Sequence, residues 1–330
     1  MPNNQKELKT VEPSESLSDK LRAEIKRIMR AMLFDPLMME FKAIKSNAVS
    51  KSKLVRKVES GDLQYISGVF VGKSDAATSK TLKELGARFD KRRKGWVIAQ
   101  PRMPADLQTA VKAQIKQREK LEQAAREALA TIDSRMKSMM SKIDFSTYAT
   151  ANEDDVDDKV LASMADELAV QPKLDADQKK ALKEQYTENI KLSIQGFADD
   201  EVKRFRKNLL PKIKDGINRA ELISYVQKRL KVSDTRAAFI ARQETALFTS
   251  KQKELLYLDA GVTRYRWSAI GGKAGDGRTR DSHANAHGKI FYWDKDRGPK
   301  GALKPRNAEG NTVNPGEDFG CRCRAVPIID

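Results

Sequence analysis

Four residues near the carboxyl-terminal end of the chain have side chains that bind metals. The 330-residue sequence holds two histidines, His283 and His287, and two cysteines, Cys321 and Cys323. Their imidazole nitrogens and thiolate sulfurs make up a ligand set that Zn²⁺ binds tetrahedrally. The histidines are four positions apart, which allows them to share one helix face or one long turn. A zinc site formed by these four residues is therefore one of two interpretations.

A metal-free arrangement of the same residues is the alternative. A Cys-x-Cys pair is less usual in zinc sites than Cys-x-x-Cys, and the side chains would then pack and hydrogen-bond in a small core. A disulfide between Cys321 and Cys323 is excluded because one intervening residue makes the bridge strained. The lack of a disulfide framework indicates a reducing compartment.

The segment that contains these residues is rich in loops and needs a stabilising interaction to hold it in one conformation. Residues 271–320 are dense in Gly, Asn, Asp and Pro, which predicts long irregular loops. Residues 264–269, by contrast, have the composition of a strand. A bound metal is one of the few devices that hold such a loop-rich segment in place.

Catalytic interpretations of the segment are weaker than structural ones. The His-Ala-Asn-Ala-His run is superficially similar to His-Asn-His metal nucleases, but in those enzymes the three residues are spread over a hairpin and a helix. A Cys–His nucleophile pair is the other catalytic option. Glu244 lies on a predicted helix, and we expect it to anchor that helix to a loop through Arg242, Arg278 or Arg280 rather than to act as a general base.

A series of short motifs runs through the same third of the chain in a fixed order. They are Arg236-Ala237, Ile240-Ala-Arg242-Gln-Glu244-Thr245, a helix to Gly261, Trp267, Arg280-x-x-His283, Gly288, Pro315-Gly316, Cys321-Arg-Cys323 and Pro327. In this order and spacing, residues 215–330 resemble the phage Mu F-type head morphogenesis domain. The chain departs from the family pattern at Gln243, where an Arg-Thr-Glu or similar triplet is usual. Many relatives also carry Cys-x-x-Cys near the two histidines.

The resemblance implies a minor capsid protein of a tailed phage that is not an enzyme. It implies a few copies per head, association with the portal protein and with other capsid or scaffolding proteins, and incorporation into the procapsid. It also implies a role during DNA packaging or ejection. The location implied is the virion, and the host cytoplasm during assembly.

The charge of the chain points to a polyanionic partner. The sequence has 63 Lys and Arg against 46 Asp and Glu, a formal net charge of +17. Such a field attracts nucleic acid, and we expect double-stranded DNA to bind without sequence preference. No stretch approaches the roughly 20 apolar residues of a membrane helix, so no membrane partner is expected. The rival hypothesis is a metal-dependent, nuclease-like enzyme that uses the His/Cys cluster, and a third is an effector activity within residues 1–150.

Composition favours long helices over sheets. Charged residues make up 33% of the chain and aromatic residues 6%. We predict a mainly α fold with small α+β modules, elongated and multi-domain, with long helices and a loop-rich C-terminal domain. The predicted segments are an N-terminal helical segment (1–60), a small β-α-β-β module (61–103), a long helical region (104–214) and the Mu F-type domain (215–330).

The N-terminal segment begins with a polar stretch. Residues 1–15 are expected to be disordered or ordered by a partner. From Ser16 the apolar spacing predicts a basic amphipathic helix that breaks at Pro36. That helix packs on its own domain or docks on a partner through its methionines, which are Met29, Met32, Met38 and Met39.

The module at 61–103 carries a basic turn. We expect a strand over 63–71, a helix over 79–85, and two strands around the turn within 87–98. The Leu-Gly-Ala-Arg-Phe-Asp run that ends at Asp90, followed by Lys-Gly-Trp, resembles a small unit appended to nucleic-acid enzymes. Phosphate contact by the basic residues is the functional hypothesis, and a solvated turn is the alternative. These residues are Arg88, Lys91, Arg92, Arg93 and Lys94.

The central region reads as helix with a few breaks. Apolar spacing over 104–143 predicts a rod of roughly 60 Å that serves as an exposed spacer or a coiled-coil partner. The acidic stretch 151–158 is expected to be a joint. Helices then fill 160–258, with interruptions at Pro172, at 211–216, and at 232–234, where Ser233 or Asp234 fits an N-cap.

Overall fold

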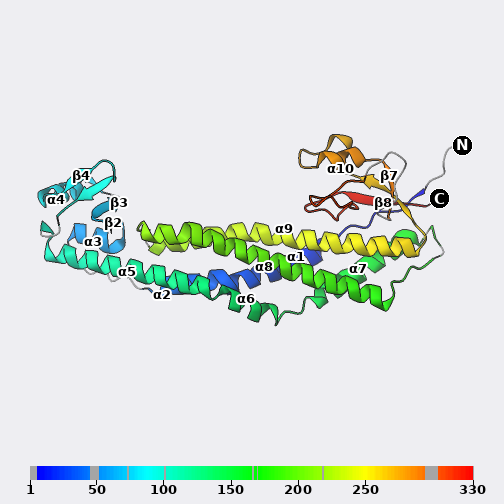
Figure 1. Ribbon diagram of the computed structural model, residues 1–330, viewed down its shortest axis with the longest axis horizontal. Helices are drawn as coiled ribbons and strands as arrows, with labels where there is room; N and C mark the ends of the chain where they lie inside the picture. Colours follow the sequence, from blue (N-terminus) through cyan, green and yellow to red (C-terminus); the bar gives the residue numbers. More distant parts are fainter. Residues whose placement is uncertain are drawn as a thin grey trace. The chain divides into compact units, whose positions relative to one another are not determined.

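The computed structural model of the protein describes residues 6–44, 52–72, 74–99, 102–165, 167–168, 170–217, 219–293 and 304–329 (Figure 1). Helices make up most of this part of the chain, and its two sheets are small and antiparallel. The predicted mainly α fold with small α+β modules is therefore confirmed. No helix in the described ranges has the length and apolar character needed to cross a membrane.

The chain divides into two compact units. The first, here called the terminal unit, combines Met1–Lys26, Ile143–Ile194 and Asp234–Asp330. The second, here called the central unit, combines Arg27–Lys142 and Gln195–Ser233. Each unit thus joins segments that are far apart in the sequence, whereas the sequence analysis divided the chain into four consecutive segments.

Helices from three parts of the sequence pack together in the terminal unit. They are α1 (Glu15–Met29), α7 (Ser146–Met164), and portions of α8 (Ala176–Lys214) and α9 (Arg219–Asp259), the last two of which also contribute to the central unit. Their inward faces bury apolar side chains, among them Leu21, Ile25, Val156, Val160, Ile190, Ile194 and Leu256. Tyr186 and Phe248 join α8 to α9 with ring centroids 4.9 Å apart.

A four-stranded antiparallel sheet completes the terminal unit (Figure 1). Its order is β1-β8-β6-β7, with bounds β1 (Lys6–Glu7), β6 (Arg264–Ser268), β7 (Ile290–Tyr292) and β8 (Arg324–Ile329). β6 confirms the strand predicted over 264–269, and Trp267 is paired with Ala325. Two short helices, η3 (Gly272–Ala274) and α10 (Asp281–Ala286), lie in the connection between β6 and β7.

The N-terminal stretch takes part in this sheet. β1 pairs with β8 in the register Lys6↔Ile329, and Leu8 and Val11 are buried. The ammonium of Lys253 on α9 donates a hydrogen bond to the carbonyl oxygen of Val11. The expectation of disorder was therefore wrong for residues 6–15, because a strand pairing and a buried cation fix them. Residues 1–5 lie outside the described part of the chain.

The small module belongs to the central unit and has one strand more than predicted. Its antiparallel sheet has the order β2-β3-β5-β4, with bounds β2 (Leu63–Ile66), β3 (Val69–Gly72), β4 (Arg88–Asp90) and β5 (Gly95–Val97). The predicted strand over 63–71 is a hairpin, because Ser67 and Gly68 both have positive φ, 49° and 86°. Two such residues form the tight turn that reverses a strand pair. Helices α3 (Lys53–Ser60) and α4 (Ala76–Glu84) complete the module.

The helix predicted to break at Pro36 continues past it. α1 passes through a π-helical turn, η1 (Arg30–Phe34), into α2 (Asp35–Ala43), and Pro36 occupies the first turn of α2. Proline is tolerated there because the first-turn N–H groups have no helical partner. Met29 and Met32 are fully buried, so they pack within the protein rather than on a partner, whereas Met39 is 71% exposed.

The rod predicted over 104–143 is wrong as a single exposed helix. α5 (Ala105–Ala130) ends where Thr131 leaves helical geometry, and α6 (Ile132–Met140) follows. α5 packs against α2 and α3 of its own unit and buries Leu107, Val111 and Leu121. These contacts use the apolar stripe that we expected to face solvent or a coiled-coil partner.

The acidic joint predicted at 151–158 is also wrong, because these residues lie inside α7. Glu153 is buried, and its two carboxylate oxygens each lie 2.6 Å from an ammonium group, one of Lys179 and one of Lys183 on α8. Glu153 therefore holds α7 to α8 through two ion pairs and does not mark a break in the helix.

Of the three predicted interruptions, two are confirmed. Pro172 lies between α7 and α8, and α8 ends at Lys214, within the predicted break at 211–216, although Pro211 itself still lies inside the helix. The N-cap predicted at Ser233 or Asp234 is wrong because α9 runs through both positions. Asp234 instead accepts a hydrogen bond of 2.9 Å from the Arg22 guanidinium on α1.

Candidate functional site

Three of the four predicted metal ligands meet in the terminal unit. His283 lies on α10 and is 2% exposed, while Cys321 and Cys323 lie in the chain just before β8. The Nδ1 atom of His283 is 3.5 Å from the Sγ atom of each cysteine. The three donor atoms all lie within 4.8 Å of one another. This cluster, His283, Cys321 and Cys323, is here called the His/Cys cluster.

His287 does not join the His/Cys cluster, so this part of the predicted ligand set is wrong. α10 ends at Ala286, and His287 has an extended backbone with ψ of 131°. The i, i+4 spacing therefore does not place the two imidazoles on one helix face. The Nδ1 atom of His287 accepts a hydrogen bond of 3.1 Å from the backbone N–H of Ala269.

The far side of the His283 ring faces a carboxylate. Oδ2 of the buried Asp318 lies 3.4 Å from Nε2 of His283 and 3.2 Å from Nη1 of Arg280. The edge of the ring packs against Trp267, with centroids 5.3 Å apart and planes at 84°. Sequence reasoning missed Asp318, because a single aspartate three residues before Cys321 carries no spacing signal of its own.

The surroundings of the two thiols shift their pKa values in opposite directions. Contact with the Cys323 thiol, together with hydrogen bonds from His283 and from the backbone N–H of Gly316, lowers the pKa of Cys321. The same contact with Cys321 and the burial of its own side chain raise the pKa of Cys323. Of the two cysteines, Cys321 therefore loses its thiol proton more readily, and Cys323 keeps its proton.

The Pro315-Gly316 motif docks the loop onto α9. The carbonyl oxygen of Pro315 accepts a hydrogen bond of 2.7 Å from the Ser250 hydroxyl. Gly316 has φ of +92°, and a Cβ at this position would come within 3.3 Å of Cβ of Ser250. Glycine is therefore required both by the left-handed backbone and by the close approach to the helix.

Gln243, the departure from the family pattern, fixes the next part of the loop. Its Oε1 atom accepts a hydrogen bond of 2.6 Å from the backbone N–H of Gly320, and its Nε2 atom donates to the carbonyl oxygen of Asp318. Arg280 adds a hydrogen bond of 2.6 Å to the carbonyl oxygen of Phe319. A side chain of α9 and one at the start of α10 thus hold the residues between Asp318 and Cys321.

Glu244 does not have the arginine partners that we predicted. It is buried on α9 and accepts a hydrogen bond of 2.8 Å from the Ser193 hydroxyl, and burial raises its pKa. Arg280 pairs with Asp318, and Arg242 is exposed. Positions two apart on a helix point about 200° away from each other, so Arg242 cannot reach the face that Glu244 occupies.

Trp267 and Gly288 hold the strand beside α10. Trp267 is fully buried on β6, and its carbonyl oxygen accepts a hydrogen bond of 2.8 Å from the backbone N–H of Gly288. Gly288 has φ of +77°, which lets the chain turn sharply after α10. These two motif residues have a structural role in the terminal unit.

The predicted nucleic-acid-binding residues gather at one exposed turn of the central unit. Lys91, Arg92, Arg93 and Lys94 connect β4 to β5, and Arg88 lies at the start of β4; all five are exposed. The carboxylate of Asp90 shapes the turn by accepting hydrogen bonds from the backbone N–H groups of Arg92 and Arg93.

An exposed aromatic side chain, Phe89, lies on β4 directly before the basic turn. Phe89 is 51% exposed and packs edge-on against Trp96, with ring centroids 5.4 Å apart. The turn thus combines positive charge with an open aromatic ring. Both are features of surfaces that contact nucleic acid, and the phosphate-binding role stays a prediction.

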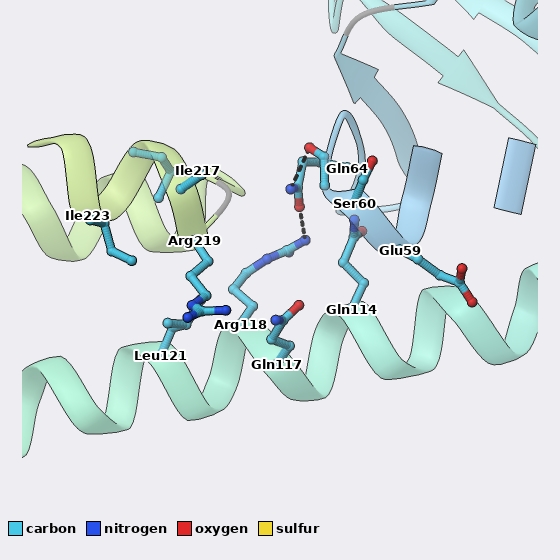
Figure 2. A pocket seen from close by; sticks show the side chains of 12 residues that line it. Glu59, Ser60, Gln64, Gln114, Gln117, Arg118, Leu121, Ile217, Arg219 and Ile223 are labelled. Atoms are coloured by element: carbon cyan, nitrogen blue, oxygen red, sulfur yellow. Dashed lines mark hydrogen bonds between the residues drawn. The ribbon is translucent and has the colours of Figure 1, made fainter. Parts of the chain in front are cut away.

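A cavity of about 330 Å³ with a mixed polar and apolar lining lies in the central unit (Figure 2). Several of its polar side chains hydrogen-bond to the protein. Arg118 on α5 donates to the carbonyl oxygen of Tyr65, and Gln114 donates to the carbonyl oxygens of Val58 and Leu63. These bonds hold α5 to α3 and β2, so the polar groups serve the fold of the module. Burial lowers the pKa of Arg118.

Comparison with known proteins finds a family match for the C-terminal third of the chain. Residues 203–326 match the family model described as phage Mu protein F like protein, which confirms the resemblance drawn from the sequence motifs. An uncharacterized protein of Haemophilus influenzae is 28% identical over 137 residues, which cover 39% of this chain and 27% of that protein. The match therefore spans about a quarter of that relative. No solved structure matches the chain.

Proposed function

We propose, with the phage Mu F-like match of residues 203–326 as premise, that the chain is a minor head protein acting in the head morphogenesis of a tailed phage. It would be carried in the procapsid and virion, after assembly in the host cytoplasm. The observation that carries this proposal is that residues of the family motifs hydrogen-bond one part of the terminal unit to another. Trp267, Gly288 and Pro315 all do so.

A structural role agrees with this use of the motifs. Asp318 and Arg280 engage each other, and Glu244 is buried against Ser193, so these groups serve packing rather than acid–base chemistry. We therefore assign the protein no enzymatic activity. Its partners would be the portal protein and other capsid or scaffolding proteins.

The portal contact is assigned to exposed apolar side chains on helices. Met39 on α2 is 71% exposed and Leu192 on α8 is 57% exposed. Large apolar side chains that stay open to solvent on a helix are suited to a protein partner. Phe319 is exposed to a similar extent, 60%, but lies in the loop held by Gln243 and Arg280, and we expect it to contribute less.

Co-expression with a tailed-phage portal protein tests the proposal. The full chain should co-purify with the portal ring. Met39→Asp or Leu192→Asp should lower the co-purified fraction at least tenfold, while the comparison variant Phe319→Asp should lower it much less. Failure of the full chain to associate with either the portal or procapsids would remove the head-protein assignment.

DNA contact is the second part of the proposed role. The net charge of +17 and the exposed turn at Lys91–Lys94 support non-specific binding to double-stranded DNA during packaging or ejection. Counterion release would then set the affinity, which should fall steeply between roughly 50 and 200 mM salt.

The alternative is a metal-dependent, nuclease-like enzyme that uses the His/Cys cluster. The observation in its favour is that the cluster has three protein ligands, the number found in catalytic zinc sites with an open position. Incubation of the full chain with plasmid DNA and Zn²⁺, Mg²⁺ or Mn²⁺ separates the two functions. Turnover that is lost in His283→Gln but kept in His287→Gln would establish the enzyme.

A further inference from the structure

We propose that His283, Cys321 and Cys323 bind one zinc ion, that Asp318 orients His283 from the opposite side of its ring, and that His287 is not a ligand. The proposal goes beyond head assembly and does not depend on it, because it rests on the geometry of the terminal unit alone. It also differs from the four-ligand set that the sequence suggested.

The distances within the cluster are those of a tetrahedral zinc site. With Zn–S near 2.3 Å and Zn–N near 2.0–2.1 Å, two donors of a tetrahedron are separated by about 3.6 Å for a nitrogen and a sulfur, and about 3.8 Å for two sulfurs. The two distances from Nδ1 of His283 to the sulfurs are both 3.5 Å. All three donor atoms lie within 4.8 Å of one another.

Hydrogen bonding alone does not account for this convergence. Nδ1 of a neutral imidazole has either one hydrogen or one lone pair, so it can serve only one of two sulfurs well at a time. Here Sγ of Cys321 and Sγ of Cys323 approach the same nitrogen equally closely. A cation placed between three donors uses one lone pair from each and satisfies all of them together.

The surroundings of His283 match those of a zinc-bound histidine. A histidine that binds zinc through Nδ1 carries its hydrogen on Nε2, and such hydrogens are usually donated to a carboxylate. Nε2 of His283 is buried, and Oδ2 of Asp318 lies 3.4 Å from it, although no hydrogen bond of standard geometry reaches Nε2 within the described residues. A small rotation of the ring on metal binding would complete that bond.

The charges of the site balance when zinc is present. Two thiolates neutralise one Zn²⁺ ion, and the carboxylate of Asp318 is neutralised by the Arg280 guanidinium 3.2 Å away. The backbone N–H of Gly316 donates to Sγ of Cys321 and so supports its charge. A buried cluster without net charge avoids the cost of placing an isolated ion in the protein interior.

The ion would join two parts of the chain that are far apart in sequence. His283 is separated from Cys321 by 38 positions, so zinc would close that loop and fix α10 against the start of β8. In the described residues no fourth His, Cys, Asp or Glu belongs to the cluster. We therefore assign the fourth position to a water molecule.

Metal analysis of the full chain, after removal of any affinity tag and dialysis against a chelator, tests the proposal. Added Zn²⁺ should be retained at one ion per chain. Replacement by Co²⁺ should give the intense visible absorption of a tetrahedral site and a thiolate-to-cobalt charge-transfer band in the near ultraviolet. A chain that retains no metal, or a cobalt spectrum without the charge-transfer band, would overturn the proposal whatever the variants do.

Variants then assign the ligands. Cys323→Ser should lower the charge-transfer absorption by about half, and His283→Gln should abolish retention of one ion per chain. Asp318→Asn should weaken zinc binding by about 10–100-fold without changing the number of thiolate ligands. His287→Gln is the matched control and should bind zinc as the unaltered chain does.

The outcome for His287→Gln keeps the assignment falsifiable even if a cysteine variant fails to fold. If this control loses metal as completely as His283→Gln, the three-ligand site is wrong and the four-ligand set returns. None of these readouts involves the portal or DNA, so their failure is separate from failure of the proposed function.

Discussion

Lys253 shows how one buried side chain ties the N-terminal stretch to α9. Its ammonium is buried and donates to the carbonyl oxygen of Val11, 2.9 Å away. Burial lowers its pKa from the usual 10.5 to about 8, while Glu12 acts in the opposite direction and Arg324 adds to the lowering. The folded protein therefore holds this proton less tightly than the unfolded chain does.

We predict that the free energy of unfolding, compared with that of Lys253→Met, rises by up to about 3 kcal/mol from pH 8 to pH 10.5. The sign follows because the pKa of Lys253 is lower in the folded protein than in the unfolded chain. Its contribution to stability is therefore fully present only above the unfolded-state pKa of 10.5. This contribution is lost as the pH falls toward 8. Chemical denaturation of both proteins across this range measures it, and parallel pH profiles would contradict it.

A second prediction at this scale concerns Gly316. Gly316→Ala should destabilise the terminal unit by about 2–3 kcal/mol, because alanine disfavours positive φ and its Cβ would press on Ser250. Gly310→Ala is the matched control, since Gly310 has φ of +83° but a Cβ added there would meet nothing within 4 Å. Thermal unfolding should show the larger loss for Gly316→Ala, and equal losses would mean that the close contact with α9 costs nothing.

Three residues of the candidate site could be predicted from their side-chain chemistry, whereas one residue was wrongly included because of its spacing. His283, Cys321 and Cys323 were found because their side chains are chemically distinctive and rare in the chain. His287 was added because of its i, i+4 spacing, and this failed because α10 ends before it. Asp318 was not found, because its role arises only when the loop folds back on α10.

At the scale of elements, local periodicity was reliable and boundaries were not. The hairpin at Ser67-Gly68 has a two-residue turn signal, but the apolar residues on both sides read as one strand. The acidic residues inside α7 suggested a joint, because the sequence does not reveal that Lys179 and Lys183 neutralise Glu153. Long-range ion pairs of this kind override local composition.

The basic turn between β4 and β5 allows a test of DNA binding by one element. We predict that Lys91→Gln, Arg92→Gln and Arg93→Gln together weaken binding to double-stranded DNA and reduce the dependence of log affinity on log salt by about 2–3 units. The control replaces Lys112, Lys116 and Lys120, exposed on α5, with Gln. Fluorescence anisotropy at several salt concentrations should then show a smaller loss, and equal losses would mean that net charge alone attracts DNA.

At the scale of the whole molecule, the sequence did not reveal which segments share a unit. Amphipathic patterns show that a helix has a partner but not which helix it is. The terminal unit therefore combines α1, α7 and α9 from three distant parts of the chain, and its sheet takes an N-terminal strand next to β8. Both ends of the chain stabilise the same unit.

This arrangement predicts that the first residues are required for the C-terminal domain to be stable. Removing residues 1–12 deletes β1, removes the carbonyl that binds Lys253, and leaves β8, paired only with β6, as the edge strand of the sheet. Exposed edges bind other strands, so the shortened chain should self-associate and be digested faster by protease near β8. Size-exclusion chromatography and limited proteolysis measure both effects, with removal of residues 1–5 alone as the control. If the two truncated chains elute and digest alike, β1 does not stabilise the sheet, and the N-terminal stretch would be free to bind a partner, as its polar composition first suggested.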